Sequence, residues 1–244
     1  MKRRLDELLI ERGLASDSGT ARALIMAGSV LVDETVADKA GRRYPVDAQL
    51  RVRQKCRYVS RGGLKLERGL QYFGLEVTGR CCLDIGASSG GFTDCLLQHG
   101  AGKVFAVDVA YGQLDWQIRT DRRVVVMERF NARKLTPELL GQPVDLTVID
   151  ASFISLTALL PVLPPLFADN PPAIVCLIKP QFELAKAQVG RGGVVRDPAL
   201  HQEAIDRISD FAASIQLRCH ATVASPILGP KGNREFLAYL GNPR

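Results

Sequence analysis

The sequence lacks the features that mark membrane-spanning and zinc-binding proteins. It contains no apolar run approaching the roughly 18 residues that a membrane-spanning helix needs. Its three histidines are scattered and its six cysteines form no Cys-x-x-Cys pair, so the common zinc motifs are excluded. The basic start, Met1 to Arg4, leads into an amphipathic segment and not into an apolar signal core. We therefore expect a cytoplasmic protein without bound metal.

Aromatic residues are also scarce, at 6% of the chain with a single tryptophan, whereas apolar residues of all kinds make up 46%. That apolar share allows a sizeable core and argues against a disordered chain. The length of 244 residues suits one large domain with a small one attached. Several cysteines lie in or beside apolar runs, and we expect them to be buried, reduced thiols.

Excess positive charge is concentrated in the first quarter of the chain. Residues 1–61 contain 13 Lys and Arg against 8 Asp and Glu, a net charge of +5, while the whole chain has +6. This asymmetry indicates a polyanion-binding module attached to a nearly neutral body. A solvated basic surface without a partner would give the same surplus.

The same quarter has the pattern of two short helices with strands after them. Leucines at helical spacing fill residues 5–12, and Gly13 can end that helix. A second helix follows, capped by Ser16 or Ser18 and ending near Gly28. Two strands are predicted beyond it, over residues 29–33 and 50–53.

Residues 4–9 and 21–32 resemble the αL RNA-binding module first seen in a small-subunit ribosomal protein. The matching pattern is Arg-Leu-Asp-x-Leu-Leu followed by the Ala-x-x-Leu-Ile-x-x-Gly-x-Val-x-Val segment. The resemblance covers about 50 residues and implies binding to structured RNA, but it names no reaction. The candidate RNA contacts are Arg4, Arg12, Arg22, Arg42, Arg43 and Arg61.

A basic linker at residues 51–58 separates this module from the rest of the chain. We place the domain boundary near residues 54–60. The predicted division is an RNA-binding domain with its linker at 1–59 and a larger domain at 60–244.

A glycine-rich turn opens the larger domain. An apolar strand at residues 81–83 leads to Asp84, a small flexible stretch covers 86–91, and a helical pattern begins at Phe92. Glycine lets the backbone approach a ligand, and the helix start offers free N–H groups. The turn indicates an adenosine-type cofactor at the carboxyl end of a parallel sheet. Its spacing departs from Gly-x-Gly-x-x-Gly, so alone it is weak, and a nicotinamide dehydrogenase is an alternative.

Strand and helix patterns alternate from residue 80 onward, which is typical of a Rossmann-like, doubly wound α/β sheet. The predicted strands are buried apolar runs. They cover 81–83, 104–107, 124–127, 146–149 and 173–178, with weaker ones near 222–224 and 235–239.

Polar residues follow several of these strands, and parallel strands bring their carboxyl ends to one rim. Asp108 is placed to accept ribose hydroxyls, and Glu128 or Asn131 to read an adenine edge. Asp150 and Lys179 end the next two strands. A lone acid at a strand end is usually a turn residue, so the convergence of the set is the informative feature.

The larger domain resembles the FtsJ-type methyltransferases, and the whole chain resembles the TlyA (haemolysin A-like) family. The segments that support this run nearly end to end, at 60–66, 84–94, 111–116, 149–156, 177–183 and 232–236. The family implies transfer from S-adenosylmethionine to a ribose 2′-hydroxyl, with a cytidine of ribosomal RNA as the target. It also implies a catalytic tetrad, which falls here on Lys65, Asp150, Lys179 and Glu235. The cofactor-binding candidates are Asp84, Gly86, Ser88, Gly90, Gly91, Phe92, Asp108, Glu128, Asn131 and Asp150.

The chemistry assigns roles within the tetrad. A hydroxyl is a poor nucleophile and should lose its proton as the new bond forms. We expect Lys179 to be the base, Lys65 to be the neighbouring cation, and the two acids, Asp150 and Glu235, to orient the lysines near the methyl group. Alignment of the reactants would supply much of the remaining rate.

Other residues and functions stay open. Phe92 and Trp116 could contact a base, but core packing is the commoner role for such aromatics. The glycine-rich loop at 191–196 could hold RNA phosphates. Ribosomal RNA or ribosomal subunits are the expected partners, and a monomer is the expected state. The alternatives are a non-catalytic RNA-binding or assembly factor, a membrane-lysing protein and, more distantly, an oxidoreductase.

Overall fold

The computed structural model describes residues 1–52 and 56–242. The chain divides into two compact units, Met1–Cys56 and Arg57–Arg244. This division falls a few residues before the one predicted at 59/60. Residues 53–55, which include part of the predicted basic linker and the end of the predicted strand at 50–53, lie outside the described residues.

In its described residues, the first unit is a small α+β domain with two short helices and five short strands. Leu5 and Leu9 from the first helix and Ile25 from the second are fully buried in its core. Strand β2 pairs with β3 on one side and β5 on the other, and β1 pairs with β4. The elements are β1 Lys2–Arg4, α1 Leu5–Glu11, α2 Ser18–Met26, β2 Val30–Val32, β3 Thr35–Val36, β4 Arg43–Pro45 and β5 Leu50–Val52.

The predicted helix capping in this unit was wrong in one respect. The second helix is capped by Asp17, whose carboxylate accepts a hydrogen bond of 2.8 Å from the Thr20 N–H, and not by Ser16 or Ser18. A carboxylate at this position also complements the positive end of the helix dipole. The predicted stops at Gly13 and Gly28 are confirmed, since both glycines adopt a left-handed conformation with φ of 68° and 64°.

The second unit is a seven-stranded mixed sheet with helices on both faces. Every strand that the sequence predicted is present, and the two weak ones are longer than expected. The strands are β6 Cys81–Ile85, β7 Lys103–Val107, β8 Val124–Met127, β9 Leu146–Ile149, β10 Ala173–Ile178, β11 Arg218–Ala224 and β12 Phe236–Gly241. The α-helices are α3 Gly62–Phe73, α4 Gly91–Gln98, α5 Trp116–Arg119, α6 Pro137–Leu140, α7 Pro180–Glu183 and α8 Pro198–Ser214, and the 3-10 turns are η1 Ala132–Lys134, η2 Leu156–Ala158, η3 Leu160–Val162, η4 Pro164–Phe167, η5 Lys186–Gln188 and η6 Pro230–Gly232.

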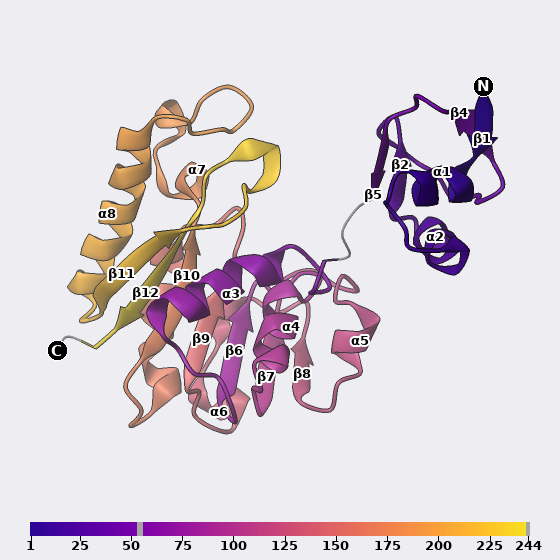
Figure 1. Ribbon diagram of the computed structural model, residues 1–244. Helices are drawn as coiled ribbons and strands as arrows, with labels where there is room; N and C mark the ends of the chain where they lie inside the picture. Colours follow the sequence, from indigo (N-terminus) through magenta and orange to yellow (C-terminus); the bar gives the residue numbers. More distant parts are fainter. Residues whose placement is uncertain (53–55, 243–244) are drawn as a thin grey trace. The chain divides into compact units, whose positions relative to one another are not determined.

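The alternation of side chains along the strands separates two packing layers. Ile174 and Cys176 of β10 join the core cluster that contains Ile208 of α8. Val175, between them, faces the opposite side, where it lies near Gly69 of α3. Helices α3 and α4 therefore cover one face and α8 the other, and Figure 1 shows α3 and α4 in front of the sheet.

The strand order is β11-β12-β10-β9-β6-β7-β8. From β6 the chain first adds β7 and β8 on one side and then returns to add β9 and β10 on the other, all parallel. The last strand, β12, inserts antiparallel between β10 and β11. The direction of winding reverses between β6 and β9, which is where ligands bind in open α/β sheets.

Candidate active site

The glycine-rich turn leaves β6 at this reversal point and is packed tightly against the end of β9. Gly86 has φ of 84°, and a Cβ placed on it would lie 2.6 Å from the backbone oxygen of Asp150. Only glycine allows both that conformation and that approach. Ser88, at φ 49°, is held by a hydrogen bond of 2.8 Å from its N–H to the Asp108 carboxylate. The turn is therefore braced by two neighbouring strand ends.

A first cavity of about 400 Å³ opens beside the turn. Asp108 and Asn131, predicted to hold an adenosine, are among its lining residues. Asp108 already accepts the N–H groups of Ser88 and Ala110, both at 2.8 Å, and each of its oxygens keeps a further lone pair for a ligand. The apolar part of the lining includes Ile85, Val107, Val109, Phe130, Ile154 and Leu159.

A second cavity of about 300 Å³ lies on the other side of the turn and is more polar. Lys65, Lys179 and Asp150 line it, together with Gly91, Phe92 and Arg61. Gly86, Ser88, Asp150 and Ser152 line both cavities. Asp150 and Ser152 therefore stand at the junction of the two spaces.

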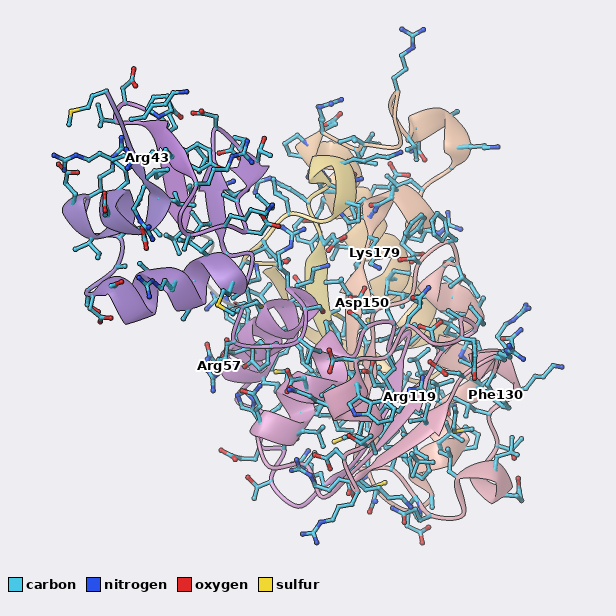
Figure 2. The ribbon with its side chains drawn as sticks, turned by 90° about the vertical axis from the view of Figure 1, so that its right-hand side faces the viewer. Arg43, Arg57, Arg119, Phe130, Asp150 and Lys179 are labelled. Atoms are coloured by element: carbon cyan, nitrogen blue, oxygen red, sulfur yellow. The ribbon has the colours of Figure 1, made fainter. Side chains whose placement is uncertain are left out.

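Lys179 and Asp150, both labelled in Figure 2, form a close ion pair at that junction. Lys179 Nζ lies 2.6 Å from Asp150 Oδ1, and it donates an aligned hydrogen bond of 2.8 Å to Ser152 Oγ. The lysine is only 6% exposed. These groups meet because β9 and β10 are parallel neighbours that end at the same rim of the sheet.

Lys65 and Glu235 form the second ion pair of the predicted tetrad. Lys65 Nζ donates a 2.6 Å hydrogen bond to Glu235 Oε2, and the carboxylate has no exposed surface. Glu235 lines neither cavity, so it lies behind Lys65. The structure thus brings all four tetrad residues into one region as two pairs, but it does not place Glu235 at the cavity surface where the methyl group was expected.

Asp84, predicted to contact a cofactor, lines neither cavity. Its side chain is fully buried and accepts a 2.6 Å hydrogen bond from the Thr93 hydroxyl. Burial raises the pKa of Asp84 to about 7, and the nearby Asp150 and Asp108 carboxylates add to this. Asp84 braces the start of α4 instead of lining the pocket.

Two further cofactor candidates have other roles in the structure. Glu128 accepts hydrogen bonds from Arg119, at 2.6 Å, and from the Gly112 N–H, at 2.9 Å, and the Arg119 contact lowers its pKa. Gly90, at φ 92°, packs against Leu114 instead of lining a cavity. Neither residue lines the first cavity.

The two aromatic residues considered as contacts to a base, Phe92 and Trp116, have different surroundings. Phe92 is 3% exposed and contributes to the second cavity, whereas Trp116, for which core packing was the commoner expectation, is 73% exposed. Sequence reasoning missed Phe153, which lines the first cavity, is 90% exposed and has φ of 64°. Its ring lies 5.2 Å from that of Phe182. The position of Phe153 shortly after the strand end at Asp150 was the available signal.

In the first unit, several arginines that were predicted to contact RNA form hydrogen bonds within the protein. Arg12 donates to the backbone oxygens of Val46 and Ala48, so it fastens the end of α1 to a turn. Arg4 forms two hydrogen bonds, of 3.0 and 2.9 Å, with the buried carboxylate of Asp6. Arg22 reaches the same carboxylate at 3.5 Å but is more exposed. Arg12 is thereby better explained as a structural residue.

The other basic candidates keep exposed side chains. Arg42 lies over the ring of Tyr44 at 5.3 Å, and Arg43, labelled in Figure 2, has no side-chain partner among the described residues. Arg61 belongs to the second unit and borders the second cavity. These residues remain candidates for contact with phosphate.

The glycine-rich loop at 191–196 is fixed at its base. The Asn233 side chain accepts a 3.0 Å hydrogen bond from the Val195 N–H and donates one of 2.9 Å to the Gly193 oxygen. The loop is thus tied to the segment that leads into Glu235.

The described residues contain no helix long and apolar enough to cross a membrane. Within those same residues, no group of three or more His, Cys, Asp or Glu side chains is arranged to hold a metal ion. Four of the six cysteines are buried, and burial raises the pKa of the Cys82 and Cys95 thiols to about 12.

Comparison with known protein families gives two matches in this chain. The FtsJ-like methyltransferase family matches residues 58–242, and the S4 domain matches residues 3–50. Among solved structures of low identity, a magnesium protoporphyrin IX methyltransferase from Synechocystis PCC 6803 has a TM-score of 0.52 at 12% identity, over 75% of this chain and 84% of that one. That likeness concerns the fold alone.

Relatives with much higher identity span almost the whole chain. The 16S/23S rRNA (cytidine-2′-O)-methyltransferase TlyA of Mycobacterium tuberculosis is 46% identical over 97% of this chain and 89% of its own. Hemolysin A of Brachyspira hyodysenteriae is 38% identical over 97% of this chain and 98% of its own. A protein from Streptococcus thermophilus assigned as a hemolysin has a solved structure with a TM-score of 0.76, at 40% identity, over 99% of this chain and 88% of that one.

Proposed function

The chain belongs to the FtsJ-like methyltransferases and, within them, to the family of TlyA and Hemolysin A, and on that membership we propose that it methylates a ribose 2′-hydroxyl of ribosomal RNA. The observation that supports this best is the Lys179–Asp150 pair at the junction of two cavities. One cavity suits a cofactor and the other a substrate group. A reaction between two bound molecules requires such a junction.

The lining of the first cavity fits S-adenosylmethionine. Asp108 offers carboxylate oxygens to ribose hydroxyls, Asn131 offers an amide, and Phe130 with Ile154 offers an apolar surface for the adenine. Asp150, at the far end, favours a positively charged group. When bound, S-adenosylmethionine supplies a methyl group attached to a cationic sulfur.

Lys179 is proposed as the group that removes the proton from the hydroxyl. Its amine borders the second cavity, and its hydrogen bond to Ser152 fixes the direction of Nζ. In its neutral form it accepts the hydroxyl proton, and the ammonium that results lies 2.6 Å from the Asp150 carboxylate. This ion pair stabilises the charge that develops during the reaction.

Lys65 is proposed to hold the substrate in the second cavity. Glu235 fixes Lys65 through their buried 2.6 Å contact, while Lys65 itself reaches the cavity wall. An ammonium has three donors, so two are left for a ribose or phosphate oxygen. Glu235 thus acts through Lys65 and does not contact the substrate.

The N-terminal S4 domain is proposed to position ribosomal RNA through its exposed arginines. Because the relative from Mycobacterium tuberculosis is named for cytidine in 16S and 23S rRNA, we propose cytidine in one or both ribosomal RNAs as the target here. We further propose that the protein acts in the cytoplasm as a monomer. Contacts from these arginines to phosphates would fix the position of the RNA and would not by themselves select a base.

The test is methyl transfer from labelled S-adenosylmethionine to ribosomal subunits and free ribosomal RNA, prepared from cells that lack the endogenous enzyme. Wild type is compared with Lys179→Met, which keeps the length of the side chain and removes the amine. We expect label at a ribose 2′-oxygen with wild type and a loss of about 10²-fold or more with the variant. A variant with near-normal turnover at high pH would contradict the role of Lys179.

Two alternatives have distinct outcomes in related measurements. Specific RNA binding without cofactor binding or label transfer would favour a non-catalytic assembly factor. Leakage of liposomes on addition of the purified protein would favour the membrane-lysing activity that the name Hemolysin A suggests for its relative.

A further inference from the structure

Glu183 is a buried carboxylate close to the reaction centre that the proposed mechanism does not use. It ends α7, the single helical turn that begins directly after Lys179, and is 3% exposed. Its Oε2 accepts a 2.5 Å hydrogen bond from Ser155 Oγ, and its Oε1 accepts one of 3.0 Å from the Leu156 N–H. Both partners follow Asp150 closely in the chain.

A carboxylate in this position is costly for stability. Burial raises the pKa of Glu183, and its two hydrogen bonds and the more distant Arg207 only partly oppose this. An apolar residue of similar size would have no desolvation penalty. An apolar residue would, however, leave the Leu156 N–H and the Ser155 hydroxyl without their acceptor, so the partners that Glu183 holds are the relevant feature.

Those partners fix the start of a 3-10 turn. Ser155 precedes η2, and its hydroxyl accepts a 3.2 Å hydrogen bond from the Thr157 N–H while donating to Glu183. Glu183 also accepts a hydrogen bond from the Leu156 N–H. The end of the 150–155 segment is thereby anchored to the helix that follows Lys179.

The beginning of the same segment is the reaction centre. Asp150 and Ser152 contact Lys179 Nζ at 2.6 and 2.8 Å. Phe153 between these two anchors has φ of 64°, a conformation that persists only when the surroundings impose it. The segments 150–155 and 179–183 are thus joined at two points, by Lys179 with Asp150 and by Glu183 with Ser155.

We propose that Glu183 is a positioning residue that fixes Asp150 and Ser152 against Lys179. The proposal rests on the methyl transfer proposed above. Glu183 lines neither cavity, so it contacts neither cofactor nor substrate. Its removal should therefore affect the chemical step more than binding. A shift of about 1 Å in a reacting group is enough to lower a rate by about 10²-fold.

The experiment compares Glu183→Leu, Glu183→Gln and Ser155→Ala with wild type in the full-length protein. Glu76→Gln, at an exposed glutamate with no side-chain partner among the described residues, is the matched control. For each we would measure kcat and KM with ribosomal RNA, the Kd of S-adenosylmethionine by calorimetry, and Tm. Glutamine retains an oxygen for the Leu156 N–H and an amide beside Ser155, whereas leucine loses both contacts.

We expect Glu183→Leu to lower kcat by about 10²-fold, with KM and the cofactor Kd within about threefold of wild type. Glu183→Gln should recover most of that loss, and Ser155→Ala should fall between the two. A wild-type kcat in Glu183→Leu would overturn the proposal. A parallel loss of kcat, cofactor binding and Tm in both Glu183 variants would also overturn it, because that result marks a purely structural residue. A wild-type protein without methyl transfer would contradict the proposed function itself.

Discussion

Lys65 Nζ and Glu235 Oε2 lie 2.6 Å apart although 170 residues separate them in the chain. Lys65 comes from the first helix of the methyltransferase unit, and Glu235 immediately precedes the strand β12. The antiparallel insertion of β12 beside β10 brings Glu235 to the same rim as Lys179. The pair therefore forms only when β12, the last strand of the chain, joins the sheet beside β10.

Removing one partner of this buried pair should destabilise the protein. Glu235→Leu leaves the Lys65 ammonium without its counter-charge at 10% side-chain exposure. We expect a loss of about 3–5 kcal/mol in the free energy of unfolding. The double variant with Lys65→Met should recover much of this stability but no activity. Urea unfolding of the three proteins tests this, and a double variant as unstable as the single one would contradict it.

Asp84 should make the stability of the methyltransferase unit fall as pH rises. Its pKa is raised from an unfolded value near 3.8 to about 7, so between these values the folded state binds a proton that the unfolded state has lost. The free energy of unfolding should then decrease with pH by up to about 1.4 kcal/mol per pH unit, levelling off above pH 7.

The isosteric variant Asp84→Asn isolates this contribution, because it cannot titrate. We would measure urea unfolding of both proteins from pH 5 to 8. The stability difference between them should change steadily up to about pH 7. A difference that stays constant over this range would show that Asp84 does not titrate there.

Arg12 and Arg43 should separate structural from RNA-binding roles in the S4 domain. Arg12→Ala removes two hydrogen bonds to backbone oxygens and should lower stability by about 1 kcal/mol. Arg43→Ala should leave stability unchanged, since its side chain is exposed. It should instead weaken RNA binding and reduce the slope of log K against log salt by about 1. Thermal unfolding measures the effect on stability, and RNA titrations at several salt concentrations measure the effect on binding. If only Arg12→Ala reduced the slope of log K against log salt, the two assignments would be reversed.

Phe153 should contribute to substrate handling and not to folding. With 90% of its surface exposed at the edge of the first cavity, its ring is available to stack on a base. Phe153→Ala should keep Tm within about 2 °C and lower kcat/KM for RNA by about 10-fold. That loss is about 1.4 kcal/mol, within the range of about 1–3 kcal/mol for stacking of one base on an aromatic ring. Tyr72→Ala is the control, because it removes an exposed aromatic ring on α3 that lines neither cavity. Equal kcat/KM for all three proteins would exclude a role for Phe153.

Local sequence patterns were enough to predict the strands of the larger domain, the glycine-rich turn and the residues at the strand ends, whereas β1, β3 and β4 of the first unit were not predicted. These features are local: apolar periodicity, glycine positions and the polar residue that follows each buried strand. Asp84, Asp108, Asp150 and Lys179 were placed at one rim because parallel strands share a direction. Family resemblance added Lys65 and Glu235, which no local pattern connects.

The partners of the individual charged groups became clear from the folded structure. Asp84 and Glu128 occupy positions that suit a cofactor ligand, yet Thr93 and Arg119 engage them. Arg12 is basic and lies in an RNA-binding domain, yet it binds two backbone oxygens. Arg12 meets its partners 34 and 36 positions away, and even the two closer pairs join residues nine positions apart. Such pairings depend on how the intervening turns fold and on the need to satisfy buried polar groups, so apolar periodicity does not specify them.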